Sequence, residues 1–214
     1  MLEFPGKRVD QWDETLITSA AFQELLSSGT DTSCCYKLSD VKFTPSFDLV
    51  KLINSLNFSH DFCMSGRKTT YFGIFAYEYA GTYHPPTPFS SNKFVLEMFN
   101  FVSNSFPLLN LNSCLLNYYP DTSCTIPLHS DNESSIDPHS FIITLSLGCT
   151  RTLTFKKICH SNLKLIDLVS LSNGEVIAFS KTSQRFFKHG LVPEGPITKL
   201  PRVSATFSRI TPRN

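Results

Sequence analysis

A histidine and an aspartate two residues apart are the first side chains whose types and spacing suggest chemistry. His129 and Asp131 stand in the run Leu-His-Ser-Asp-Asn-Glu. If this run lies on a strand, both side chains point to the same face, because strand side chains alternate. A His and a carboxylate with a second, distant His form the facial triad of non-haem Fe(II) oxygenases. His189 is the obvious distant partner, although a short His-x-Asp pair arises often by chance and His189 alone would suit an ordinary loop histidine.

The composition of the chain is that of an ordinary globular protein. Its 214 residues suit one domain, or a domain with an extension, and are enough to bury a core. The 19 phenylalanines favour a β-rich core. A net charge of +1 gives no bulk electrostatic case for nucleic acid, so any such binding must rest on a local patch.

The cysteines and the lack of long apolar runs bear on location. Seven cysteines without a Cys-x-x-Cys pair argue against a zinc knuckle or a disulfide framework and predict reduced thiols. No apolar run approaches the length of a membrane span, and residues 1–10 lack the apolar core of a signal peptide. We expect a soluble cytoplasmic protein, with a nuclear location left open.

Periodicity predicts few helices and many short strands. Helical spacing favours helices at residues 13–26, 47–56 and 93–106, and one or two strands between 67 and 86. Further β-rich runs separated by turn residues are 111–119, 125–131, 141–147, 152–156, 163–171, 175–180 and 202–210. Short strands at this spacing are typical of a jelly roll or barrel, whose mouth can hold a ligand.

Aromatic and basic residues alternate near the start of the β-rich part. Tyr77 and Tyr79 follow Arg67 and Lys68, and together they would make a stacking platform for an unpaired base with phosphate contacts beside it. An aromatic sheet face packed in the core is the commoner outcome of this pattern, and a solvated surface pair is the commoner outcome for the two basic residues.

Several segments in fixed order carry a resemblance to a known family. They are Asn117-Tyr118-Tyr119, the run from His129 to Glu133, Ser146-Leu147-Gly148, Arg151-Thr152-Leu153-Thr154-Phe155, Asn173-Gly174-Glu175, His189 and the run from Pro201 to Phe207. The chain resembles the AlkB family of Fe(II) and 2-oxoglutarate-dependent dioxygenases, including the AlkB domains of plant RNA virus replicases. The resemblance covers about residues 67–211 and leaves residues 1–45 outside.

The resemblance implies a cofactor site. By position, His129, Asp131 and His189 look like the iron ligands. Arg202 looks like the anchor for the distal carboxylate of 2-oxoglutarate, which a guanidinium binds through two parallel hydrogen bonds; its alternative is an exposed edge-strand charge. The remaining cosubstrate positions implied are Asn117, Tyr119, Ser204 and Thr206.

The chain departs from the family at the end of its closing motif. The family has a second arginine six residues after the first, and this chain has Ser208 there, followed by Arg209. On a regular strand Arg209 points away from the face that Arg202 shares, so only a local bulge would bring it inward. In the family the second arginine lies close to the cosubstrate and to the acidic residue that corresponds to Glu133. Its absence puts cosubstrate affinity and full activity in doubt.

The resemblance also implies a substrate. Glu133 matches the acidic residue near the substrate base, and Tyr77 and Tyr79 match aromatic positions of the substrate lid. We hypothesise that Tyr79 stacks on a base whose other face meets His129, with Arg67 as a phosphate contact.

The fold and activity that follow from the resemblance complete the expectation. The fold class is α+β, a double-stranded β-helix (jelly roll) with N-terminal helices packed on the sheet. We expect an N-terminal extension at residues 1–45, lid strands and supporting helices at 46–110, and the catalytic core at 111–214. Using Fe(II), 2-oxoglutarate and O2, the protein would oxidatively demethylate 1-methyladenine, 3-methylcytosine or N6-methyladenine in single-stranded nucleic acid, with RNA favoured. If the chain is viral, we expect it to be part of a larger replicase polyprotein in the host cytoplasm. Alternatives are a 2-oxoglutarate oxygenase of proteins or small molecules, and an inactive RNA-binding module.

Overall fold

Two β-sheets form the body of the chain in this computed structural model, which describes residues 14–28, 35–60, 66–79, 81–159, 162–193 and 195–212. The larger sheet has the order β1 (Glu14–Ile17), β2 (Cys35–Lys42), β12 (Glu175–Ser180), β9 (Phe141–Gly148), β14 (Arg202–Ser208), β7 (Ser113–Tyr119), β4 (Lys68–Gly73) and β3 (Ser59–His60). The smaller sheet has the order β11 (Asn162–Leu171), β10 (Arg151–Cys159), β13 (Phe187–Leu191) and β8 (Ile126–His129). Strands β5 (Tyr77–Tyr79) and β6 (Thr82–His84) form a separate hairpin. β1 runs parallel to β2, and the other strand pairs of the described chain are antiparallel.

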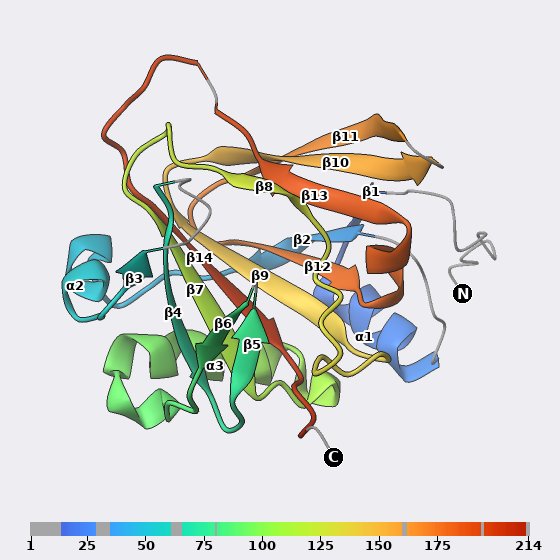
Figure 1. Ribbon diagram of the computed structural model, residues 1–214. Helices are drawn as coiled ribbons and strands as arrows, with labels where there is room; N and C mark the ends of the chain where they lie inside the picture. The colour runs from blue at the N-terminus through green and yellow to red at the C-terminus, as the bar shows by residue number, and fades with distance from the viewer. Residues whose placement is uncertain are drawn as a thin grey trace.

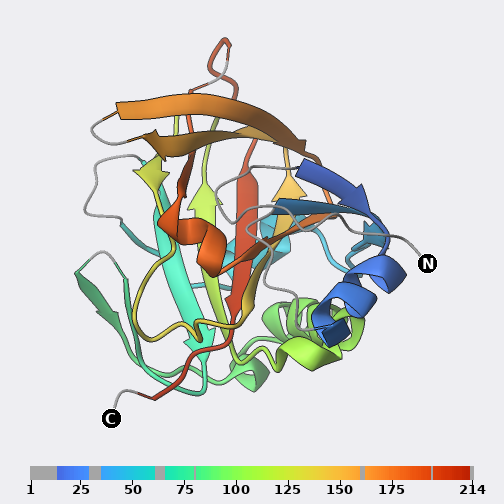
Figure 2. The same ribbon diagram turned by 90° about the vertical axis from the view of Figure 1, so that its right-hand side faces the viewer.

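The larger sheet is covered on both faces. Figure 1 shows the smaller sheet above it and the helices α1 (Ser19–Ser28), α2 (Leu49–Asn54) and α3 (Lys93–Ser105) along its other side. Figure 2 shows β10 and β11 as a curved band across the top of the molecule, above the strands of the larger sheet. The 3-10 turns η1 (Phe89–Ser91) and η2 (Pro107–Leu109) flank α3, and η3 (Thr182–Arg185) joins β12 to β13. No helix of the described residues is long and apolar enough to cross a membrane.

Alternation along β14 explains the two layers. Val203, Ala205 and Phe207 are fully buried in the apolar core that also contains α3. The intervening polar residues face the other way, into a pocket between the sheets: Arg202, Ser204, Thr206 and Ser208. β14 pairs with β7 from Arg202 opposite Tyr119 to Ser208 opposite Ser113, without a register shift. One strand therefore supplies both a core face and a polar face for the pocket.

The structure agrees with most of the expected elements. The seven expected β runs of the second half all occur as strands, with ends shifted by a few residues, and the expected helices at 47–56 and 93–106 occur as α2 and α3. The described chain is mostly β with few helices, consistent with a jelly-roll fold, and the connectivity of a double-stranded β-helix stays a prediction. Residues 1–13 and the other gaps named above lie outside the described residues, including the stretch expected to lack a signal peptide.

The expected helix at 13–26 is partly wrong. Its first part is strand β1, and the helix α1 begins only at Ser19, where Asp40 of β2 accepts hydrogen bonds from the Ser19 backbone N–H and hydroxyl group at 2.6 and 2.7 Å. β2 lies within the larger sheet and Phe22 of α1 is fully buried. Part of the expected extension at residues 1–45 therefore packs into the same fold.

Candidate metal centre and its pocket

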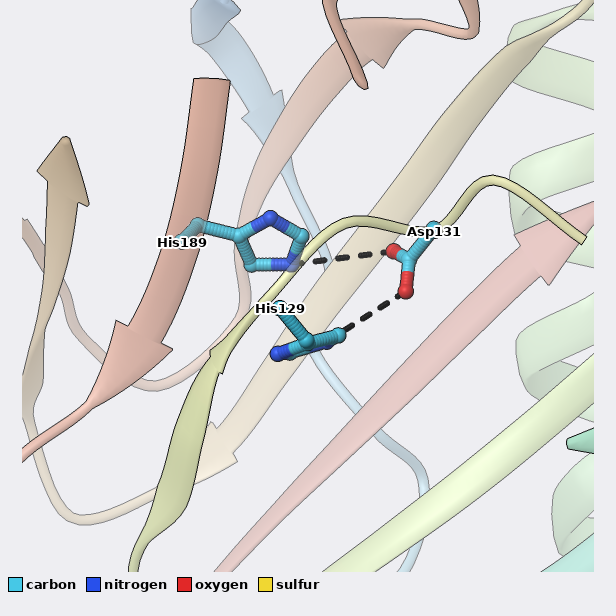
Figure 3. Close-up of side chains that lie close together, drawn as sticks. All are labelled: His129, Asp131 and His189. Atoms are coloured by element: carbon cyan, nitrogen blue, oxygen red, sulfur yellow. Dashed lines mark ion pairs between the residues drawn. The ribbon is translucent and has the colours of Figure 1, made fainter. Parts of the chain in front are cut away.

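The three expected ligands meet on two neighbouring strands and the loop that follows one of them. His129 is the last residue of β8, Asp131 lies in the loop that follows, and His189 lies in β13 directly opposite His129. Nε2 of His129 lies 3.3 Å from Oδ1 of Asp131, and Nε2 of His189 lies 3.6 Å from Oδ2 (Figure 3). The three ligand atoms all lie within 4.8 Å of one another. The site thus forms although Asp131 lies beyond the end of the strand on which it was expected.

The orientation of His129 suits a metal ligand. Its Nδ1 lies 2.9 Å from the carbonyl oxygen of Pro127. A carbonyl only accepts hydrogen bonds, so Nδ1 carries a proton and Nε2 faces Asp131. Two such atoms are stable side by side only with a proton or a metal ion between them. The hydrogen bond to Pro127 also fixes the ring, as partners behind metal-bound histidines commonly do.

The protonation states also suit a metal. Burial would raise the pKa of Asp131, but the hydrogen bond from His129 and the charges of His189 and Lys181 hold that pKa well below its usual range. Burial lowers the pKa of His189 to about 4, and the charge of His129 acts in the same direction. Near neutral pH the carboxylate is therefore ionised and His189 is neutral, the forms in which these groups bind metals.

Residues without any signal in the sequence hold the ligand loop. The Lys181 ammonium group donates to the backbone carbonyls of Asp131 and Glu133 at 2.8 and 3.0 Å. The buried amide oxygen of Gln184 accepts from the Asp131 N–H at 3.0 Å. Both residues lie in or beside η3, a few residues before His189, and neither has a spacing that would have revealed this role.

The expected cosubstrate residues line one wall of the pocket, on adjacent strands of the larger sheet. Arg202 and Ser204 of β14 lie directly opposite Tyr119 and Asn117 of β7. All four, with Thr206, line the same pocket as the three expected ligands. The expected cosubstrate positions and the expected metal ligands therefore face one another across this pocket.

Arg202 is a buried cation without an acidic partner among the described residues. It is 1% exposed, its Nε donates to the hydroxyl group of Ser146 at 3.1 Å, and its guanidinium lies 5.4 Å from the Tyr119 ring centre. Burial lowers the pKa of Arg202. A buried guanidinium needs a counter-charge. The alternative of an exposed edge-strand charge is wrong, and the site fits a dicarboxylate.

Arg209 does not take the place of the family's second arginine in the structure. Ser208 lines the pocket and its hydroxyl group lies 2.8 Å from that of Ser113. Arg209 points outward and pairs with Asp137 at 3.4 Å, with 44% of its side chain exposed. The regular register of β14 provides no bulge to turn it inward. The pocket nevertheless contains a second guanidinium, because Arg67 lines it and is only 2% exposed.

The aromatic lid residues lie on the hairpin strand β5. Tyr77 and Tyr79 line the pocket, and their rings lie 6.2 Å apart in a stacked arrangement. The Tyr79 ring lies 6.5 Å from that of His129 at an interplanar angle of 78°. The hypothesis that a base stacks between Tyr79 and His129 would therefore require one of these two rings to turn. The buried position of Arg67 also differs from that of a solvated surface pair.

Glu133 has the only buried carboxylate oxygen without a hydrogen-bond partner among the described residues. Burial raises the pKa of this carboxyl group, and the charge of Asp131 adds to the effect. The charge of Glu133 in turn contributes to raising the pKa of the Tyr77 hydroxyl group, which burial raises most. Glu133 thus lies near Tyr77 of the lid with one hydrogen-bonding atom unused, but it is not among the residues that line the pocket.

Comparison with known proteins gives one family. The 2OG-Fe(II) oxygenase superfamily matches residues 59–209. The chain is 30% identical over 107 residues to the alpha-ketoglutarate-dependent dioxygenase alkB homolog 3 of Mus musculus. The matched stretch covers 47% of this chain and 37% of that protein. It is 32% identical over 100 residues to the DNA oxidative demethylase ALKBH2 of Arabidopsis thaliana, 44% of this chain and 31% of that protein. The matched stretches are thus about a third of the length of these relatives. Among solved structures, that of OsALKBH1 matches with a TM-score of 0.47 and 19% identity, over 89% of this chain and 90% of that one.

Proposed function

Because the chain belongs to the 2OG-Fe(II) oxygenase superfamily, we propose that it oxidatively removes N-methyl groups from nucleic-acid bases. The observation that carries this proposal is one pocket that joins a His-Asp-His triad, a buried arginine and the aromatic residues of a hairpin. The name of one relative, a DNA oxidative demethylase, supports the same substrate class, and that of the other, an alpha-ketoglutarate-dependent dioxygenase, supports the same kind of reaction.

The cofactors of the family are Fe(II), 2-oxoglutarate and O2, and the residues present fit them. When bound, they supply the oxidation: 2-oxoglutarate is converted to succinate and CO2 while one oxygen atom enters a C–H bond of the substrate. On an N-methyl group the product is an N-hydroxymethyl group, which breaks down to formaldehyde and the unmethylated base. His129, Asp131 and His189 would hold the metal.

The protein's own contribution is binding and orientation. Arg202 would take the distal carboxylate of 2-oxoglutarate through its guanidinium, whose Nε already bonds Ser146. Asn117 and Tyr119 would hold the cosubstrate from the neighbouring strand, with Ser204 and Thr206 beside them on β14. Because these strands and the metal ligands face one another, the cosubstrate would bridge the two sheets.

The hairpin side of the pocket would bind the methylated base. Tyr79 offers a ring face for stacking, with Tyr77 packed against it. The unpartnered oxygen of Glu133 would accept a hydrogen bond from the exocyclic amino group of adenine or cytosine. We propose single-stranded RNA as the preferred substrate, and a replicase polyprotein as the setting, on the sequence resemblance alone.

Defined oligonucleotides test the proposal. Single-stranded RNA and DNA oligomers that carry 1-methyladenine, 3-methylcytosine or N6-methyladenine are incubated with the protein, Fe(II) and 2-oxoglutarate. We expect loss of the methylated nucleoside with equal amounts of succinate and formaldehyde. Unmethylated oligomers and the His129→Ala variant are the controls, and both should release no formaldehyde.

The alternatives give different results. Release of succinate with a peptide or small-molecule panel, and none with any oligomer, would assign the site to another substrate class on the same fold. If oligomers bind but 2-oxoglutarate is never consumed, the protein is an inactive RNA-binding module, a function that Ser208 in place of the second arginine would favour.

A further inference from the structure

Arg67 is a buried cation next to the cosubstrate wall. It directly precedes β4, where Thr69 lies opposite Asn117 of β7. The side chain is 2% exposed and lines the pocket. Burying a guanidinium costs free energy unless its donors and its charge are used. We therefore expect the guanidinium of Arg67 to interact with other groups of the pocket.

Arg67 fixes the orientation of Asn117. Nη1 of Arg67 donates to Oδ1 of Asn117 at 2.7 Å, a charge-assisted hydrogen bond between two buried side chains. The amide oxygen of Asn117 is thereby occupied, and its NH2 group donates to no other described residue. The amide therefore presents donors, rather than an acceptor, to the pocket, which is the polarity that a carboxylate requires.

The same guanidinium reaches the lid. Its Cζ lies 5.5 Å from the centre of the Tyr79 ring, within the range of a cation–π contact. Arg67 thus contacts a residue of the cosubstrate wall and a residue of the hairpin at once.

Arg67 also supplies the second positive charge of the pocket. Arg67 and Arg202 both line the pocket, whereas Ser208 occupies the position of the family's second arginine and Arg209 faces outward. A dianion such as 2-oxoglutarate is attracted by both charges. The second guanidinium of this pocket comes from the start of β4 instead of the end of β14.

We propose that Arg67 is a positioning residue for the cosubstrate. Arg67 holds the Asn117 amide with its NH2 group toward the dicarboxylate, and it provides the positive charge that is missing because Ser208 takes the place of the family's second arginine. The identity of the dicarboxylate as 2-oxoglutarate rests on the proposed function.

Binding calorimetry of 2-oxoglutarate to the Mn(II)-loaded protein tests this without turnover. We expect Arg67→Met to weaken binding at least about tenfold, as for a lost hydrogen bond to a charged group. Asn117→Ala should also weaken binding, and the double variant should lose less affinity than the sum of the two single effects, because part of the contribution of Arg67 passes through Asn117. Arg209→Met, which removes an outward arginine, is the matched control and should bind 2-oxoglutarate like the parent protein.

A second variant covers the case in which Arg67→Met does not fold. Asn117→Asp keeps an oxygen for Arg67 but replaces the NH2 group by an anionic oxygen, so it should remain folded by circular dichroism and lose 2-oxoglutarate binding more severely than Asn117→Ala. Wild-type affinity in Asn117→Asp would overturn the proposal.

Other outcomes separate this inference from the proposed function. Unchanged 2-oxoglutarate affinity in a folded Arg67→Met variant, with weaker binding of methylated oligomers, would make Arg67 a substrate contact and overturn the positioning role. Failure of the parent protein to bind 2-oxoglutarate at all would instead overturn the proposed function. Strictly additive effects in the double variant would show that Arg67 does not act through Asn117.

Discussion

At the scale of residues, Asp131 is the acidic residue that lies next to both histidines of the triad. It lies 3.3 Å from His129 and 3.6 Å from His189, and its own loop is held by Lys181 and Gln184. Both contacts hold the backbone of the loop and leave the carboxylate group free of them. A change at this residue should therefore affect the metal before it affects the fold.

We expect Asp131→Asn to lower Mn(II) affinity by about a hundredfold or more, because the anionic ligand is lost while the shape is kept. Titration calorimetry measures the affinity, and the thermal midpoint without metal should change little. Asp137→Asn is the control, since Asp137 pairs with Arg209 outside the pocket. Unchanged metal affinity in Asp131→Asn would show that the three residues do not form a metal site.

At the scale of elements, the turn between β11 and β12 supports the Arg202 anchor. Gly174 has a φ of +80°, donates its N–H to the carbonyl of Ser146 at 2.7 Å and accepts from the N–H of Phe43 at 2.9 Å. Ser146 in turn accepts from Arg202. A Cβ at Gly174 would lie 2.2 Å from the carbonyl oxygen of Phe43.

Gly174→Ala should therefore destabilise the protein by about 2 kcal/mol or more, through both the left-handed backbone and the clash. Gly81→Ala is a matched control, because Gly81 has a φ of +77° and no atom lies within 4 Å of the place that a Cβ would take there. Its cost should be about 1 kcal/mol. Urea unfolding measures both, and equal costs would contradict the role of the close approach.

The spacing of residues reveals the site better than it reveals the elements around it. The ligands and Arg202 are recognisable because a His-x-Asp pair, a distant His and a closing arginine keep their order in the chain. Periodicity does not reveal strand β13, since Phe187 to Leu191 is short and contains Gly190. The sequence of strand β1 has the spacing of a helix start. The segment is a strand because it pairs with β2, a tertiary contact that local periodicity does not encode.

Burial is the property that the sequence could not supply. Nothing in the order of residues separates Arg67, which is 2% exposed, from Arg209, whose side chain is 44% exposed. The difference arises from the strand register, which turns one guanidinium into the pocket and the other toward Asp137. The same register explains why an arginine one position late does not replace one at Ser208.

At the scale of the whole molecule, the two halves of the site belong to different sheets. Two of the proposed metal ligands lie on β8 and β13 of the smaller sheet, and the expected cosubstrate residues lie on β7 and β14 of the larger one. The described strand pairings do not join these sheets directly by backbone hydrogen bonds. Apolar side chains such as Phe155, Ile142 and Phe179 fill the space between them.

A cosubstrate that chelates the metal at one end and meets Arg202 at the other would act as a removable cross-link between the sheets. Mn(II) alone should slow amide hydrogen exchange mainly in β8 and β13, and added 2-oxoglutarate should extend the protection to β7 and β14. Exchange measured by mass spectrometry on the parent protein and on Arg202→Met checks this, and the variant should lose only the second step. Protection of all four strands by Mn(II) alone would mean that the sheets are already rigidly coupled. If the protection spreads in these two steps, the supply of 2-oxoglutarate would set how tightly the two layers of this protein are held together.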